Sequence, residues 1–346
     1  MTVGRKYPHG SGFQYTDSRR VSRLISDRVN PHDMLTAEIG PAYAEYRRRW
    51  DLARSFRVIP PFPLHVDYEM KFRCNLRCPM CLMSLDAEGR AAYGQSDREL
   101  SAAKVLELAA EGAAEGQRAM GFGGLWEPLL APELPDIVAE ARSLGLVDVM
   151  FNTNGLLLTE KVGRALIEAG LTRLMISLDA DTPETYARMR VGSDFETVSA
   201  NIRNFMALRR RMGRVLPLVR LSFCRTAINE QELEPFLDRW HEVVDFFSIQ
   251  TYGRYAGAAP PDFPASRLVP PPPGRCAQPH KRLLVRHTGE VMPCCDASGV
   301  SLIVGDVHQN SLAEIWRGEK LAALRETFAP HSLKLCETCL ACQSKF

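Results

Sequence analysis

The chain has 346 residues, of which 45% are hydrophobic and 24% are charged, and its formal net charge is +2. This length can bury one large core together with a smaller second unit. Charges of both signs are mixed along the chain, without a basic tract or an acidic tail, so the composition argues against nucleic acid as a partner.

Residues 1–61 form an N-terminal extension with no recognisable chemistry. Met1 to Ser11 is polar and lacks the apolar core of a signal peptide, and no window approaches roughly 18 apolar residues, so we expect no export and no membrane partner. Pro41 to Trp50 has a helical pattern. Its arginines, Arg47 to Arg49, could contact a phosphate, but a short charge run is usually a solvated helix face.

A regular alternation of strand-like and helical runs begins at Leu64 and ends near Tyr252. The expected strands are 64–72, 119–124, 146–154, 171–179, 215–226 and 245–252. The expected helices open at 97–100, 132, 159, 182, 195 and 230. Strands that alternate with helices predict a parallel α/β sheet with right-handed crossovers, whose ligands bind at the carboxyl ends of the strands.

Three cysteines, Cys74, Cys78 and Cys81, follow the first expected strand with the spacing C-x3-C-x2-C. Three thiolates can hold a [4Fe-4S] cube while leaving one iron open to a small molecule. The alternatives are a zinc knuckle or three buried thiols. Zinc normally takes four N or S ligands, and neither His65 nor His9 lies at finger spacing, so we favour the iron–sulfur cluster.

The run Cys-Asn-Leu-Arg-Cys-Pro-Met-Cys from Cys74 to Cys81 resembles the signature of the radical S-adenosylmethionine (SAM) superfamily. The resemblance implies a partial (β/α)6 TIM-like barrel over residues 62–256. It also implies that SAM binds the open iron and is cleaved by one electron to a 5′-deoxyadenosyl radical, which abstracts a hydrogen atom. A flavodoxin- or ferredoxin-type protein would supply that electron.

Two SAM contacts are carried over from this resemblance outside the strands. Gly123-Gly-Leu-Trp-Glu127 is similar to the Gly-Gly-Glu loop of the family, which makes Glu127 the acceptor of a hydrogen bond from the SAM amino group. The alternative is a turn with Trp126 in the core. Arg190 stands where related enzymes often carry an arginine that pairs with the SAM carboxylate, although a surface helix arginine would look the same.

Two strand ends resemble further SAM-contacting signatures of the family. Asn152-Thr-Asn154-Gly is similar to the signature of the third strand, and Ser177-Leu-Asp179 to that of the fourth. The alternation of side chains along a strand places Asn152 and Asn154 on one face, and likewise Ser177 and Asp179. In a barrel these polar faces are expected to line the lumen.

The composition changes after Tyr252. Residues 257–275 are rich in Pro, Ala and Gly, with a proline run from Pro270, and predict a stiff linker. The tail, residues 276–346, holds six of the ten cysteines, and Thr288-Gly289 is expected to join strand-like runs over 282–286 and 290–293. Such cysteine grouping indicates metal ligation in a reducing cytoplasm rather than a disulfide framework.

Four thiolates of this tail can close a second [4Fe-4S] cluster. The tail resembles the SPASM/twitch domain of radical SAM enzymes, including Gly305-Asp-Val-His and Ser311-Leu-Ala-Glu-Ile-Trp316. The full version of that domain has more cysteines, so we expect one auxiliary cluster. A structural zinc ribbon is the alternative. The expected ligands are Cys276, Cys294, Cys336 and Cys339, with Cys342 as a substitute.

Three strand faces are expected to line the lumen and to form a polar pocket for a small polar substrate, the alternative being ordinary solvated strand ends. They are His65, Asp67, Glu69 and Lys71; Arg220, Ser222 and Cys224; and Ser248, Gln250 and Tyr252. Within the resembled family, enzymes with one auxiliary cluster act on aminocyclitols and amino sugars of antibiotic pathways. We therefore expect an oxidoreductase that dehydrogenates a carbinol of an amino sugar, aminocyclitol or nucleoside sugar, with the auxiliary cluster accepting an electron.

Four alternatives remain open at this stage. Cys224 could donate a hydrogen atom and make the reaction an epimerisation, or the enzyme could decarboxylate a sugar acid. A peptide- or protein-modifying maturase is the third, although such relatives commonly carry a leader-binding domain for which residues 1–61 are short. The fourth is a non-catalytic metal-binding scaffold, against which the intact Cys74, Cys78 and Cys81 argue.

Overall fold

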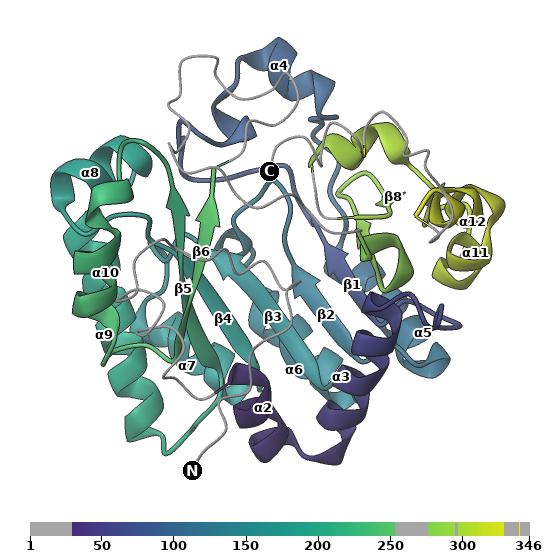
Figure 1. Cartoon of the computed structure of the whole chain (residues 1–346), viewed down its shortest axis with the longest axis horizontal. Helices are drawn as coiled ribbons and strands as arrows, with labels where there is room; N and C mark the ends of the chain where they lie inside the picture. Colours follow the sequence, from purple (N-terminus) through teal and green to yellow (C-terminus); the bar gives the residue numbers. More distant parts are fainter. Residues whose placement is uncertain (1–29, 253–275, 295–296, 329–338, 340–346) are drawn as a thin grey trace.

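A computed structural model describes residues 30–252, 276–294, 297–328 and 339. These residues form one nine-stranded sheet in the order β6-β5-β4-β3-β2-β1-β7-β8-β9 (Figure 1). The first six strands pair in parallel with their sequence neighbours, which confirms the predicted α/β partial barrel. They are β1 (His65–Tyr68), β2 (Ala119–Phe122), β3 (Asp148–Thr153), β4 (Arg173–Ser177), β5 (Leu218–Arg225) and β6 (Phe246–Thr251).

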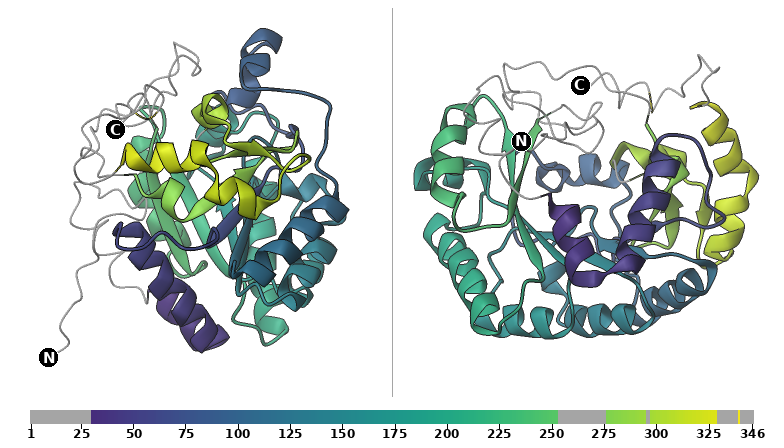
Figure 2. Two further views of the ribbon diagram at one scale, coloured as in Figure 1. Left: turned by 90° about the vertical axis from the view of Figure 1, so that its right-hand side faces the viewer. Right: turned by 60° about the horizontal axis from the view of Figure 1, so that its bottom comes forward.

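The helices between these strands form an arc outside the sheet (Figure 2, right). They are α5 (Ala102–Glu115), α6 (Leu134–Ser143), α7 (Glu160–Glu168), α8 (Pro183–Met189), α9 (Phe195–Arg211) and α10 (Leu233–Trp240), the last preceded by the 3-10 turn η3 (Glu230–Glu232). Thr159 and Thr182 cap their helices as expected. The helix expected to open at 97–100 begins instead at Ala102, where Ser101 is the N-cap and its hydroxyl accepts the Lys104 N–H at 3.1 Å.

The two faces of each strand differ in chemistry. Val66, Val149, Val219 and Leu221 belong to the buried core that the strands share with the outer helices. Because side chains alternate across a strand, the residues between them face the lumen of the barrel. The polar residues of the three predicted faces that fall within these strands are therefore placed inside the barrel by apolar packing on its outside. Lys71 lies beyond β1 and instead pairs with the half-exposed Glu99.

The N-terminal helices close the lower end of the barrel. α2 (Pro31–Ile39) and α3 (Pro41–Arg54) lie across the amino ends of the strands (Figures 1 and 2). The buried side chains that join them to the strands are Leu35, Tyr43, Tyr46 and Ala53 from the helices and Leu64, Ala119, Val147, Leu218 and Phe246 from the strand ends. The helices α2 and α3, which belong to the N-terminal extension with no predicted role, thus cover the amino ends of the strands. The carboxyl ends remain uncovered by them.

The C-terminal unit continues the same sheet. β7 (Arg282–Val285) pairs in parallel with β1, and β8 (Glu290–Met292) and β9 (Gly305–Asp306) follow in antiparallel order. Gly289, with a φ of 94°, makes the predicted turn between β7 and β8. α11 (Leu312–Arg317), which begins with a capping box from Ser311 and Glu314, and α12 (Glu319–Glu326) complete the unit. The predicted linker lies outside the described residues.

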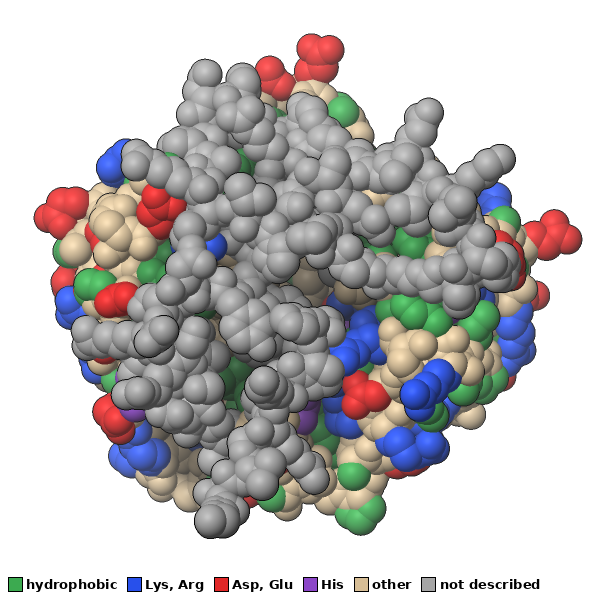
Figure 3. Space-filling model, in the orientation of Figure 1, with side chains coloured by type: hydrophobic (Ala, Val, Ile, Leu, Met, Phe, Trp, Pro, Cys, Tyr) green, Lys and Arg blue, Asp and Glu red, His purple; other side chains and the backbone are tan. Residues whose placement is uncertain are grey.

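The remaining short elements connect these parts. They are η1 (Leu82–Ser84), α4 (Ala87–Ala92), η2 (Pro128–Leu130), η4 (Gln278–His280) and η5 (Ala297–Leu302). α4 projects above the carboxyl ends of the strands at the top of Figure 1. Figure 3, which has the orientation of Figure 1, shows basic and acidic side chains interspersed around the edge of the molecule, in line with the small net charge. Within the described residues, no helix is long and apolar enough to cross a bilayer.

Candidate functional site

A pocket lies at the carboxyl ends of the strands, where the alternation of strands and helices predicted it. It is bounded by the cysteine loop after β1, the loop after β2, the ends of β4 to β6 and the β7–β8 hairpin. Its lining includes Glu69, Cys78, Cys81, Gly124, Leu125, Asp179, Arg190, Cys224, Tyr252 and Arg286. Three residues of the predicted polar strand faces, Glu69, Cys224 and Tyr252, therefore reach one cavity together with two of the three motif cysteines.

The cysteine loop is held by its own backbone and by the segment after α8. The Cys81 N–H donates to the Cys78 carbonyl at 2.9 Å, and the Arg77 N–H donates to the Val191 carbonyl at 2.9 Å. Burial raises the pKa of Cys74, and raises that of Cys81 to about 11. Buried thiols of this kind stay protonated unless a metal binds them, because a coordinating thiol is deprotonated by the charge of the metal.

The donor set suits an iron–sulfur cube. Cys74, Cys78 and Cys81 are three free thiols on one loop, and [4Fe-4S] clusters take Cys thiolates as ligands. Cys78 and Cys81 line the pocket, and Arg190 approaches Cys78 with an Nη1–Sγ distance of 3.6 Å. The cysteine loop thus offers sulfur ligands, and Arg190 offers a positive charge, in the wall of one cavity.

Asp179 and Arg190 form a buried ion pair beside this loop. Arg190 donates through Nη2 to the Asp179 carboxylate. Burial alone would lower the pKa of Arg190, but the Asp179 carboxylate and the Cys78 sulfur raise it above its ordinary value. The arginine is therefore a fixed cation of the pocket and not a surface helix arginine.

Asp179 also organises the end of β5. The Cys224 N–H donates to Asp179 Oδ1 at 2.7 Å, and Asn229 Nδ2 bridges the carbonyls of Asp179 and Cys224 at 2.7 and 2.9 Å. Asp179 has a φ of 61°, a left-handed conformation that Asp and Asn tolerate better than most residues. Burial raises the pKa of the Cys224 thiol to about 12, so this side chain is a neutral S–H in the pocket wall.

Glu127 lies next to the pocket and holds the end of β3. Its carboxylate accepts from Thr153 Oγ1 at 2.6 Å, from the Asn154 N–H at 2.8 Å and from the Leu129 N–H at 3.0 Å. Burial raises its pKa, and these hydrogen bonds oppose that shift. A carboxylate has about four acceptor sites, so three donors leave room for one more. Trp126 is buried in the core, as the alternative interpretation of this loop expected.

The three other predicted SAM contacts differ in their surroundings. Asn154 is buried and donates through Nδ2 to Asn75 Oδ1 at 2.8 Å, which ties β3 to the cysteine loop. Asn152 accepts a hydrogen bond from Arg220 at 3.1 Å, deeper in the lumen. Ser177 lies in register beside Ser222 on β5. Their contacts with SAM stay a prediction.

The predicted auxiliary ligands are only partly described. Cys276 and Cys339 are half-buried and pack against the edge of the main core, and Cys294 follows β8. Cys336 and Cys342 lie outside the described residues. The ligand set of the second cluster therefore stays a prediction.

Several residues that shape the site were missed by sequence reasoning. Arg286, just after β7, lines the pocket from the C-terminal unit, and the neighbouring His287 contacts Glu69. Asn75 contacts Asn154. Glu232 accepts from the backbone N–H groups of Asp181 and Thr182 and so fixes the turn after β4. The sequence around a buried carboxylate or histidine near a turn does not show which residue, far away in the chain, it will contact.

We expect Glu127→Gln to weaken SAM binding about tenfold. The amide has one acceptor oxygen fewer, so the hydrogen bonds to Thr153 and Asn154 and the proposed bond to the SAM amino group cannot all be kept, and one hydrogen bond with a charged partner is worth about 1.5 to 3 kcal/mol. Equilibrium binding of SAM to the reconstituted protein measures this. Glu133→Gln, at the N-terminus of α6, is the control, and unchanged affinity in Glu127→Gln would remove the assignment.

Two family models match the chain. The model of the radical SAM superfamily matches residues 68–220, and that of an iron–sulfur cluster-binding domain, SPASM, matches residues 276–343. The first implies SAM and a [4Fe-4S] cluster and the second an additional iron–sulfur centre, so the cofactors expected from the cysteine groups are confirmed.

Curated relatives match part of the chain. A GTP 3′,8-cyclase of Limosilactobacillus fermentum is 39% identical over 145 residues, which are 42% of each chain. A probable GTP 3′,8-cyclase of Methanococcus maripaludis is 34% identical over 130 residues, which are 38% of this chain and 41% of the relative. The chain thus spans less than half the length of the relatives it matches.

A solved structure shares the wider fold. The crystal structure of Streptococcus suis SuiB bound to S-adenosylmethionine superposes with a TM-score of 0.65 at 14% identity, covering 88% of this chain and 77% of that one. At this identity the likeness concerns the fold alone.

The relatives correct the predicted reaction. Dehydrogenation of an amino sugar, aminocyclitol or nucleoside sugar in antibiotic biosynthesis was expected, and the matched relatives are named as GTP 3′,8-cyclases instead. The prediction was wrong because it inferred the reaction from the expectation of a single auxiliary cluster. The number of auxiliary clusters does not distinguish a sugar substrate from a nucleotide. The expected cleavage of SAM by a radical enzyme is unaffected, and the two models and the cysteine site show that the chain belongs to the radical SAM superfamily and carries a SPASM iron–sulfur domain.

Proposed function

We propose that this protein cleaves SAM reductively at the Cys74–Cys81 loop and abstracts a hydrogen atom from an anionic nucleotide. When bound, the cluster and SAM supply a 5′-deoxyadenosyl radical, and a flavodoxin- or ferredoxin-type protein supplies the electron. The observation that carries the proposal is the meeting of Cys78, Cys81 and the Asp179–Arg190 pair in one pocket at the strand ends. This arrangement gives sulfur ligands for iron and a cation for the SAM carboxylate.

The substrate class is drawn from the relatives and from the barrel lumen. The matched relatives are named for GTP. A nucleoside triphosphate needs positive groups along the lumen to receive its phosphates. Arg220 on β5 is such a group, four residues before Cys224 and thus about 13 Å deeper along the strand.

Arg220 differs from the other arginines of the lumen. Arg173 is paired with Asp148, and Arg282 with Asp67. In the described part of the chain, Arg220 has no carboxylate partner; its Nη2 donates to Asn152 at 3.1 Å, and its buried Nε donates to no group. Burial and the charge of Arg173 lower the pKa of Arg220 to about 10. An anionic group of the substrate would offset this desolvated charge.

The experiment is anaerobic reconstitution followed by an assay for 5′-deoxyadenosine with a reductant, SAM and GTP. We expect SAM cleavage, and we expect GTP to raise its rate and to be consumed. Absence of SAM cleavage in a protein with full cluster iron would refute the proposal. SAM cleavage that GTP does not accelerate and that yields no nucleotide product would refute only the assignment of a nucleotide as the substrate.

We expect Arg220→Met to raise the KM for the nucleotide at least tenfold and to leave SAM affinity unchanged. The reason is that a hydrogen-bonded charge pair with phosphate contributes about 1.5 to 3 kcal/mol, while Arg220 lies too deep to reach the pocket of SAM. Steady-state kinetics with GTP and direct SAM binding separate the two effects. Arg214→Met, an exposed arginine just before β5, is the matched control.

A further inference from the structure

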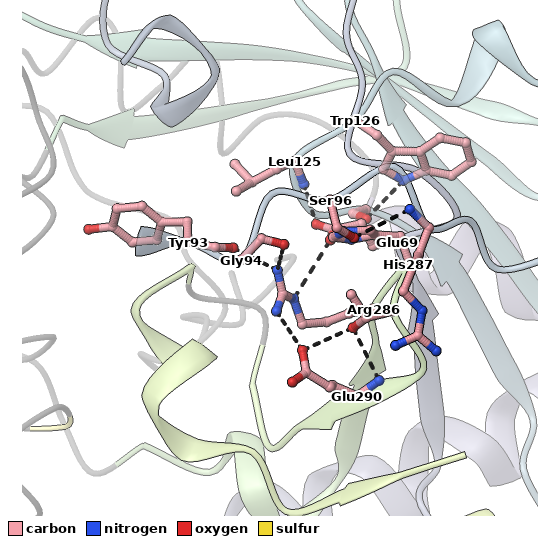
Figure 4. Close-up of polar contacts among 12 residues, drawn as sticks. Glu69, Tyr93, Gly94, Ser96, Leu125, Trp126, Arg286, His287 and Glu290 are labelled. Carbon is pink, nitrogen blue, oxygen red and sulfur yellow. Dashed lines mark hydrogen bonds and ion pairs between the residues drawn. The ribbon is translucent and has the colours of Figure 1, made fainter. Parts of the chain in front are cut away.

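A single buried carboxylate joins the barrel to the C-terminal hairpin beside the pocket. Glu69, at the end of β1 and only 3% exposed, accepts the Leu125 N–H through Oε2 at 2.6 Å. Its other oxygen accepts from Nδ1 of His287 at 2.8 Å, and Arg286 Nε lies 3.8 Å from it. Figure 4 shows Glu69 between Leu125 on one side and His287 and Arg286 on the other.

Leu125 belongs to the loop of residues 123–127 after β2, which we call the glycine loop. Gly124 and Leu125 of this loop line the pocket. Gly124 has a φ of 100°, and a Cβ at this position would collide with Glu69 Oε2. The glycine loop can therefore approach β1 closely because Gly124 has no side chain. The Glu69 carboxylate then holds the N–H of the next residue, Leu125.

Arg286 extends the same contact to the segment that follows the cysteine loop. Its Nη2 donates to the Tyr93 carbonyl at 2.6 Å and to the Gly94 carbonyl at 3.3 Å, and its Nη1 donates to Glu290 at 2.8 Å (Figure 4). The side chain is 4% exposed. The hairpin end thus holds the chain on both sides of the pocket, through Glu69 to the glycine loop and through Arg286 to the residues after α4.

We propose that Glu69 is a positioning residue that couples the docked C-terminal hairpin to SAM binding, by holding the glycine loop in its binding conformation. This inference rests on the proposed function, because it assumes that SAM occupies the pocket beside that loop. The coupling follows because the two oxygens of the Glu69 carboxylate contact different segments. His287 holds one oxygen, and this orients the second oxygen toward the Leu125 N–H. A carboxylate is needed because an amide accepts through only one of its two terminal atoms.

The test is SAM binding to the full-length reconstituted protein. Glu69→Gln is expected to raise the Kd for SAM about tenfold, equivalent to about 1.4 kcal/mol, while kcat at saturating SAM changes less than twofold. The EPR change that SAM causes in the reduced N-terminal cluster should shift to higher SAM concentration by the same factor. Glu99→Gln is the matched control, because Glu99 pairs with Lys71 near the end of β1 and is half exposed.

A second pair of variants tests the coupling from the C-terminal side. His287→Gln keeps an N–H donor for Glu69 and is expected to bind SAM within about twofold of the unmodified protein, whereas His287→Leu removes the donor and should weaken binding about fivefold. This pair decides the question even if Glu69→Gln loses iron. Equal SAM affinity in the two His287 variants would overturn the inference. Failure of the unmodified protein to bind SAM would instead refute the proposed function.

Discussion

Replacing Cys74, Cys78 and Cys81 together with alanine is expected to abolish 5′-deoxyadenosine formation and to leave about half of the iron, since two four-iron clusters have separate ligand sets. The three cysteines lie on one loop after β1, whereas Cys276, Cys294 and Cys339 belong to the C-terminal unit. Iron and sulfide analysis, together with the assay for 5′-deoxyadenosine, measures both parts of the result. The loss of activity should exceed that of any single change outside the loop.

Cys224→Ala is the matched control for this triple substitution. Cys224 lines the same pocket, but its raised pKa and its place on β5 make it a neutral wall residue, so its removal should leave the iron content unchanged. Loss of all iron in the triple variant would show that the second cluster depends on the first. Zinc in the C-terminal unit would contradict the expected second cluster directly.

The barrel could be predicted because its pattern is local. Apolar residues such as Val66 and Val149 recur on one face of each strand, and caps such as Thr159 mark where helices begin. These signals need no knowledge of the partner in space. The same period also placed Glu69, Cys224 and Tyr252 on inward faces, and all three line the pocket.

The joining of distant segments could not be predicted in this way. Pairing of β7 with β1 brings residues more than two hundred positions apart into register, as in His65 beside Arg282. The expected linker suggested two separate units, yet parallel pairing makes one sheet of them. Tyr43 and Tyr46 pack under the strand ends because the strands leave an apolar surface there. The local pattern of the sequence does not show where that surface lies.

The candidate site likewise contains residues that a local motif predicts and residues that only long-range contacts bring together. Cys74, Cys78 and Cys81 carry their chemistry in their spacing, and Asp179 and Arg190 followed from the family resemblance. The contact of Glu69 with His287 has a separation of 218 residues and no motif. The substrate was predicted wrongly because strand faces with Ser222, Cys224 and Gln250 indicate polarity and do not distinguish a sugar from a nucleotide.

Arg190→Met is expected to weaken SAM binding about a hundredfold and to destabilise the protein by about 3 to 5 kcal/mol, because it removes the cation beside Cys78 and leaves Asp179 buried without its partner. Equilibrium SAM binding and denaturant unfolding measure the two effects. Adding Asp179→Asn separates them, since Asn tolerates the left-handed backbone and its Oδ1 can still accept the Cys224 N–H. The double variant should regain most of the stability, because no unpaired carboxylate remains in it, and should still bind SAM weakly. Affinity restored along with stability would mean that Arg190 only neutralises Asp179 and makes no contact with the SAM carboxylate.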